Sequence, residues 1–106
     1  MISNKPVILL VDDTLTNLAF LNAILQQNGY RVLLARTGEK ALTIAKKEKP
    51  DLILLDVIMP GWDGYETCRR IKSDDSLVLI PVLFISELKN AEDKFTKSLV
   101  SNLYPE

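Results

Sequence analysis

Short apolar runs alternate with amphipathic stretches along this chain of 106 residues. Four runs have the length and composition of strands in a buried parallel sheet, and each is followed by a segment with helical spacing. The expected strands are Val7–Val11, Tyr30–Ala35, Asp51–Asp56 and Leu79–Ile85. Regular alternation of strands and helices predicts a parallel sheet that is covered by crossover helices, which is an α/β fold.

The segments that follow the expected strands carry the spacing and the end signals of helices. Leu18, Leu21 and Leu25 recur at helical spacing within the segment Thr14–Asn28, which stops before Gly29. The other three helices are expected to begin near Thr37, Gly64 and Asn90. The pattern therefore predicts four strand–helix units in a single domain of residues 1–106, because a chain of this length supports one hydrophobic core.

Composition and charge exclude several classes of protein. The chain has 13 Lys and Arg residues and 14 Asp and Glu residues, so it lacks the excess of positive charge that favours direct binding to nucleic acid. The apolar runs are far shorter than the ~20 residues of a membrane span, and no apolar segment precedes the first strand as it would in a signal peptide. One cysteine and no histidine argue against an internal disulfide or a typical zinc site. We expect a cytoplasmic domain.

Polar side chains stand at the carboxyl ends of three expected strands. Asp12 and Asp13 follow the first strand, Asp56 ends the third, and Ser86 follows the fourth. Right-handed crossovers allow the first and third strands to be neighbours, which would bring the three carboxylates into one pocket. Clustered carboxylates need a cation to offset their repulsion, and Mg²⁺ prefers oxygen ligands. An aspartate can also act as a nucleophile toward a phosphoryl group, so the pattern predicts a magnesium-dependent phosphoryl site.

Each of these motifs also has an ordinary structural interpretation. Asp12 and Asp13 precede a helix, where carboxylates commonly cap the first turn. Asp56 precedes Pro60 and Gly61, so it could be a turn residue. The functional interpretation is favoured by the joint placement, since all the motifs fall at the same edge of one predicted sheet.

Three runs of residues carry a resemblance to a known family. They are Val11-Asp12-Asp13, the stretch from Asp51 to Gly61 with Asp63-Gly64 after it, and the stretch from Pro81 to Ser86. Together they resemble the receiver domain of two-component response regulators, over residues 7 to 94. The flanking residues are similar to those of receivers in hybrid sensor kinases and multidomain regulators.

The resemblance implies a fold and a set of roles. The fold would be flavodoxin-like (CheY-like), a doubly wound parallel sheet with four of the usual five βα units and the strand order 2-1-3-4. Asp56 would accept a phosphoryl group from a histidine kinase or a phosphotransfer protein. Asp13 would bind Mg²⁺ directly and Asp12 mostly through water, while Asp56 and the backbone carbonyl of Ile58 would complete the protein ligands. Ser86 would hydrogen-bond the phosphoryl group and move with the conformational switch.

The C-terminal part departs from the family pattern. The chain ends at Glu106, where a fifth strand with a phosphoryl-binding lysine would begin, and Lys97 comes too early to be that lysine. An altered reading frame and a shortened chain would both give this ending. We expect a C-terminally incomplete receiver that forms a homo-oligomer through its open sheet edge, because the missing elements would leave apolar surface uncovered. Phosphorylation should be weak, because the positive charge of that lysine would be missing from the phosphoryl site.

Two other functions compete with that of a phosphoacceptor. The first is a degenerate receiver that acts as a protein–protein interaction or dimerisation module, which the missing lysine favours and the intact carboxylates oppose. The second is a magnesium-dependent phosphohydrolase with an aspartate nucleophile. Such enzymes usually carry a second aspartate two residues after the first, and here Ile58 occupies that position. We therefore expect no enzyme.

Overall fold

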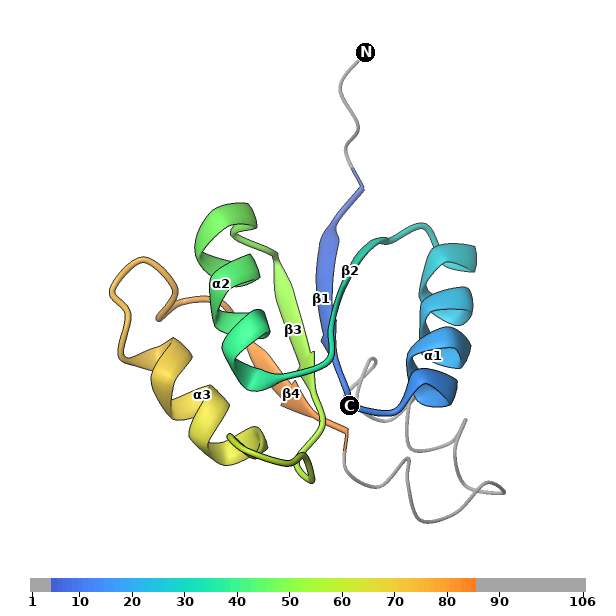
Figure 1. The fold of residues 1–106 in the computed structure, drawn as a ribbon. Helices are drawn as coiled ribbons and strands as arrows, with labels where there is room; N and C mark the ends of the chain where they lie inside the picture. The colour runs from blue at the N-terminus through green and yellow to red at the C-terminus, as the bar shows by residue number, and fades with distance from the viewer. Residues whose placement is uncertain (1–4, 86–106) are drawn as a thin grey trace.

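Four parallel strands form one sheet in the computed structural model, which describes residues 5–85 (Figure 1). The strands are β1 (Val7–Val11), β2 (Arg31–Ala35), β3 (Leu52–Leu55) and β4 (Val82–Phe84). Their spatial order is β2-β1-β3-β4, and every neighbouring pair is parallel. This confirms the predicted fold class and strand order. Ser86 and the helix expected to begin at Asn90 lie outside the described residues.

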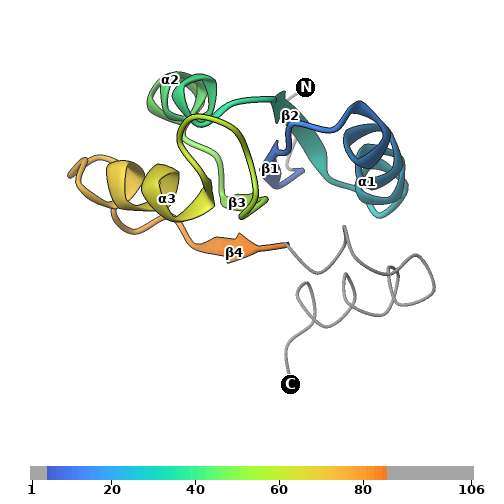
Figure 2. The ribbon, with the colours of Figure 1, turned by 60° about the horizontal axis from the view of Figure 1, so that its bottom comes forward.

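Helices cover both faces of the sheet (Figure 2). They are α1 (Leu15–Gln27), α2 (Gly38–Glu48) and α3 (Gly64–Lys72). Helix α1 lies on one face, and α2 and α3 lie side by side on the other, as a doubly wound sheet requires. Each helix connects two parallel strands, which cannot be joined by a tight turn.

Alternate residues of the central strands pack into two separate cores. On β1, Leu9 and Val11 face α2 and α3, whereas Ile8 and Leu10 face α1. This alternation follows from the strand period of two. The β3 residue Leu54 joins the core beneath α1, while its neighbours pack on the opposite face. A continuous apolar sequence in these strands is therefore the mark of a sheet that is buried on both sides.

The helix ends follow from local polar residues. The predicted cap Thr37 accepts a hydrogen bond through Oγ1 from the amide of Lys40, at 3.1 Å. Asp63 caps α3 in the same way by accepting from the amide of Glu66, at 2.8 Å. Gly29, which follows the end of α1, adopts a φ of +89°, a conformation that favours glycine. These signals set the helix boundaries within a residue or two of those predicted.

The fourth strand is shorter than the sequence predicted. The expected strand began at Leu79, but Leu79 is 92% exposed and β4 begins at Val82. The preceding residues form turns instead, with the amide of Leu77 bonded to Asp74 O at 2.9 Å and that of Ile80 to Leu77 O at 3.0 Å. Apolar residues in these turns imitate a strand in sequence, so the prediction overextended it.

Among residues 5–85, no helix combines the length and the hydropathy that a membrane span requires.

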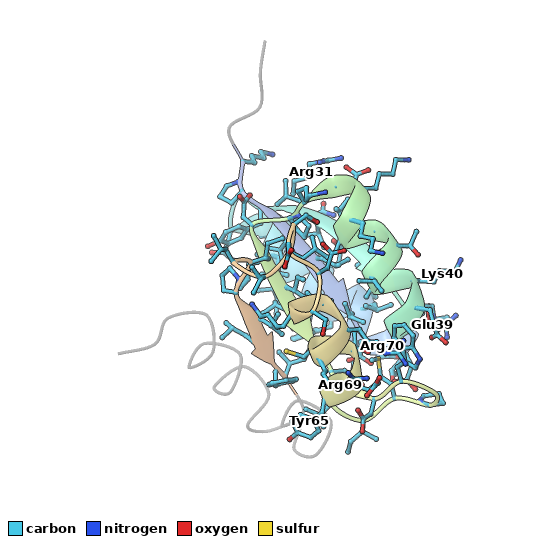
Figure 3. The ribbon with its side chains drawn as sticks, turned by 90° about the vertical axis from the view of Figure 1, so that its left-hand side faces the viewer. Arg31, Glu39, Lys40, Tyr65, Arg69 and Arg70 are labelled. Atoms are coloured by element: carbon cyan, nitrogen blue, oxygen red, sulfur yellow. The ribbon has the colours of Figure 1, made fainter. Side chains whose placement is uncertain are left out.

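A surface carboxylate on α3 gives a prediction about pH. Glu66 accepts hydrogen bonds from the guanidinium groups of Arg69 and Arg70, which project from α3 in Figure 3. These contacts, with Arg69 the larger cause, lower the pKa of Glu66 from 4.5 to about 2. Since the folded pKa is the lower one, the stabilisation is present above pH 4.5 and is lost as the pH falls from there toward 2.

An NMR titration of the Glu66 side-chain carboxyl group checks this prediction. The midpoint should lie well below the ordinary value of 4.5 and should move up in Arg69→Gln, because that variant removes the strongest donor. A wild-type midpoint at the ordinary value would show that the two arginines do not hold their contacts with the Glu66 carboxylate when the protein is in solution.

Candidate functional site

Three carboxylates meet where β1 and β3 end. One carboxylate oxygen from each of Asp12, Asp13 and Asp56 lies within 4.8 Å of the other two. Asp12 is 1% exposed and Asp56 0%, whereas Asp13 is partly exposed. The structure thus brings together the three carboxylates that the sequence placed at one edge of the sheet.

The sheet itself sets this geometry. β1 and β3 pair in register, with Val11 opposite Leu55, so the next residue of each strand is an aspartate. Their main chains continue the ladder, because the amide of Asp56 donates to Val11 O at 2.9 Å and that of Asp12 donates to Ala35 O at 3.1 Å. Two neighbouring strands therefore present their carboxylates side by side.

Asp12 is held by the beginning of α1. Its Oδ1 accepts a hydrogen bond from the amide of Thr14 at 2.9 Å, and its Oδ2 accepts one from Nδ2 of Asn17 at 3.2 Å. Asp13 lies in the same loop, and its main-chain carbonyl accepts a hydrogen bond from Nη2 of Arg36 at 3.1 Å. Residues from α1 and from the end of β2 thus position the loop that carries both carboxylates.

Asp56 lies between the sheet and the entry of α3. Its Oδ1 accepts a hydrogen bond from the amide of Ile58 at 3.3 Å. Gly64 packs so closely against this loop that an added Cβ would lie 2.4 Å from Asp56 O and 2.6 Å from Val57 Cα. The amide of Gly64 also donates to Val57 O at 2.8 Å. The first residue of α3 therefore packs directly against the main chain of Asp56 and Val57.

For two predicted site residues, Ile58 and Ser86, the expected roles stay predictions. The side chain of Ile58 is 62% exposed, and its amide contacts Asp56, while the expected role of its carbonyl stays a prediction. Ser86 lies outside the described residues, so its expected role also stays a prediction.

Sequence reasoning missed three residues that shape the site. They are Asn17, Arg36 and Gly64. Arg36 directly follows β2 at the same edge of the sheet as the carboxylates, and Asn17 lies in the first turn of the helix that follows Asp12. Both positions could have been identified from the predicted elements. The contact of Gly64 could not, since it depends on the exact approach of α3.

The chemistry of the donor set suits a hard divalent cation. Three carboxylate oxygens from separate residues can converge on one ion, and oxygen ligands are those that Mg²⁺ and Ca²⁺ prefer. Each carboxylate oxygen has two lone pairs, so those of Asp12 and Asp56 that accept hydrogen bonds can still accept another partner. The partial exposure of Asp13 leaves one side of the cluster near solvent. The residues therefore fit a cation of this kind.

Comparison with known proteins points to a single family. The sequence profile described as "Response regulator receiver domain" matches residues 8–102. The protein PilH of Pseudomonas aeruginosa is 37% identical over 87 residues, which make up 82% of this chain and 72% of PilH. The response regulator PleD of Caulobacter vibrioides is 44% identical over 87 residues, but they make up only 19% of PleD.

Solved structures agree with these sequence matches. The receiver domain of the sensor histidine kinase PA1611 from Pseudomonas aeruginosa has a TM-score of 0.74 and 29% sequence identity, over 89% of this chain and 79% of that one. That crystal structure has a magnesium ion coordinated in its active-site cleft. The fold and the matched sequence are thus found together in a protein of known structure.

Proposed function

The chain belongs to the family of response regulator receiver domains, and on this premise we propose that it receives a phosphoryl group on Asp56 in a two-component phosphorelay. The donor is a histidine kinase or a phosphotransfer protein. The proposal includes a cytoplasmic location, where such a donor presents its phosphohistidine. The response is a conformational population shift, not turnover of a substrate.

The chemistry is a single group transfer. A carboxylate oxygen of Asp56 attacks phosphorus, an O–P bond forms, and the P–N bond to the donor imidazole breaks with its electron pair left on nitrogen. The product is an aspartyl phosphate. The protein supplies position more than covalent chemistry in such a transfer. Asp56 is held by a hydrogen bond from the amide of Ile58 to its Oδ1 and by one from its own amide to Val11 O. Ser86 is proposed to contact the new phosphoryl oxygens.

Mg²⁺ is the proposed cofactor. Asp12, Asp13 and Asp56 would hold it together with the backbone carbonyl of Ile58. When bound, a divalent cation neutralises negative charge on the carboxylates and on the phosphoryl oxygens. The residues of the chain orient the acceptor oxygen and keep Asp12 and Asp56 shielded from bulk water, as their burial indicates.

The convergence of three carboxylate oxygens within 4.8 Å supports this function above all. Three carboxylates at such a distance, two of them buried, are costly without a cation, so a purely structural role for them is a poor explanation. The exposed aliphatic side chain of Ile58 also leaves no acid–base group where a phosphohydrolase would carry one. Assembly into a homo-oligomer stays a prediction.

Intact-mass spectrometry tests the proposal. The chain is incubated with acetyl phosphate, with Mg²⁺ or with EDTA. We expect a mass gain of one phosphoryl group that requires Mg²⁺, maps to a peptide containing Asp56 and is removed by hydroxylamine, as an acyl phosphate is.

The sensitivity of the phosphoryl label to hydroxylamine provides the control. A phosphoryl group on serine or threonine would survive hydroxylamine and would contradict the proposed acceptor. A chain that binds Mg²⁺ but takes up no label from acetyl phosphate or from a phosphorylated histidine donor would favour the interaction module instead.

A further inference from the structure

We propose that Asn17 is a positioning residue that holds Asp12 in its metal-binding orientation. The inference rests on the proposed function, because it concerns the same acidic site. Asn17 lies in the first turn of α1 and is not one of the three carboxylates. Its side-chain amide links this helix to Asp12, which is buried at the end of β1.

The direction of this hydrogen bond is fixed by chemistry. An ionised carboxylate can only accept hydrogen bonds, so the amide nitrogen of Asn17, not its oxygen, must face Asp12. The distance from Nδ2 to Asp12 Oδ2 is 3.2 Å. The other oxygen, Oδ1, accepts from the amide of Thr14 at 2.9 Å. With both oxygens held, rotation of the Asp12 carboxylate would break at least one hydrogen bond.

The start of α1 is built around this contact. Thr14 occupies the N-cap position, but its side chain makes no capping hydrogen bond. Instead, Asp12 accepts from the Thr14 amide and from Asn17 one turn further along the helix. A carboxylate near a helix N-terminus also interacts favourably with the helix dipole. Asp12 thus anchors the residue that precedes α1, and the side chain of Asn17 ties Asp12 to the first turn of the helix.

Two opposite effects of Asn17 on a bound cation have to be weighed. Donation by the amide draws negative charge from Asp12, which weakens its attraction for a cation slightly. The same bond keeps the carboxylate oriented before the cation arrives. Outer-shell partners of metal ligands usually contribute about 10–100-fold to metal affinity through this second effect, so orientation should dominate.

The experiment measures Mg²⁺ binding by isothermal titration calorimetry on the full chain. Asn17→Leu keeps the approximate shape of the side chain but removes the donor. Its matched control is Asn22→Leu, on the same helix, where the partly buried Asn22 accepts a hydrogen bond from Gln26 Nε2 at 2.8 Å. We expect the dissociation constant for Mg²⁺ to rise about 10-fold in Asn17→Leu and to stay at the wild-type value in Asn22→Leu.

A double-mutant cycle separates positioning from a general structural defect. In an Asp12→Asn background, Asn17→Leu should have no further effect on the dissociation constant, because the oriented carboxylate is already gone. Circular dichroism confirms that each variant is folded, and a variant that unfolds is replaced by Asn17→Ala. Unchanged Mg²⁺ affinity in the folded Asn17 variant, or an equal loss with Asp12→Asn present, overturns this inference alone. A wild-type chain that binds no Mg²⁺ overturns both this inference and the proposed cofactor.

Discussion

Asp56→Asn is expected to abolish phosphorylation and, at the same time, to stabilise the metal-free protein. An amide lacks the nucleophilic carboxylate, so no aspartyl phosphate can form. Removing one of three clustered charges should raise the free energy of unfolding by about 1–3 kcal/mol. This is less than the ~4 kcal/mol between two unit charges about 4 Å apart at an effective dielectric constant of about 20, because nearby hydrogen bonds offset part of the repulsion. Intact mass and urea unfolding in EDTA measure the two effects.

Asp51→Asn is the matched control for this experiment. Asp51 directly precedes β3, so it lies at the end of this strand opposite to Asp56. It is exposed and accepts a hydrogen bond through Oδ2 from the amide of Val7 at 2.7 Å. This variant should take up label like the wild type and should gain no stability from lost repulsion. Label retained by Asp56→Asn would place the acceptor elsewhere. Reduced stability of that variant in EDTA would show that repulsion among the carboxylates is already fully offset.

Gly64→Ala should destabilise the domain by about 3 kcal/mol, at the upper end for overpacking. The added Cβ would lie 2.4 Å from Asp56 O and 2.6 Å from Val57 Cα, and neither backbone atom can rotate away. The main chain at Asp56 must therefore shift. This loss should exceed the ~1 kcal/mol that alanine gains over glycine within a helix. Urea unfolding measures the stability, and labelling from acetyl phosphate should fall as well.

Gly29→Ala separates this steric effect from the general cost of replacing glycine. An added Cβ at Gly29 has no heavy atom within 4 Å, but the φ of +89° is unfavourable for alanine. We expect a loss of about 1–2 kcal/mol there, with labelling unchanged. A Gly64→Ala protein as stable as the wild type would show that α3 can move away from the end of β3 at little cost.

Most of the fold could be predicted because its signals are local. The continuous apolar run of β3 and the helical spacing of Leu18, Leu21 and Leu25 each reflect burial in the final structure. The exception is the segment before β4, where Leu79 is apolar but exposed. The sign in the sequence is Pro81, a residue that disfavours the interior of a strand and lies directly before β4, and the prediction included it in the strand.

The candidate site was predictable to the same extent. Asp12, Asp13 and Asp56 could be grouped because the carboxyl ends of neighbouring parallel strands share an edge. The supporting contact of Gly64 could not be derived, because it depends on how closely α3 approaches the end of β3. The position of Asn17, in the first turn of the helix that follows Asp12, could have been identified from the predicted elements. Sequence patterns specify which residues are brought together, and packing specifies how firmly they are held.

The pairing of β1 with β3 also has a consequence for biosynthesis. Asp12 and Asp13 leave the ribosome well before Asp56, and the three carboxylates become adjacent only when the later strand has joined the sheet beside the earlier one. Because a metal that requires the assembled site favours the folded state, the proposed affinity for a divalent cation would be acquired late. Uptake of the cation would therefore mark the moment at which a nascent chain has completed the centre of its sheet.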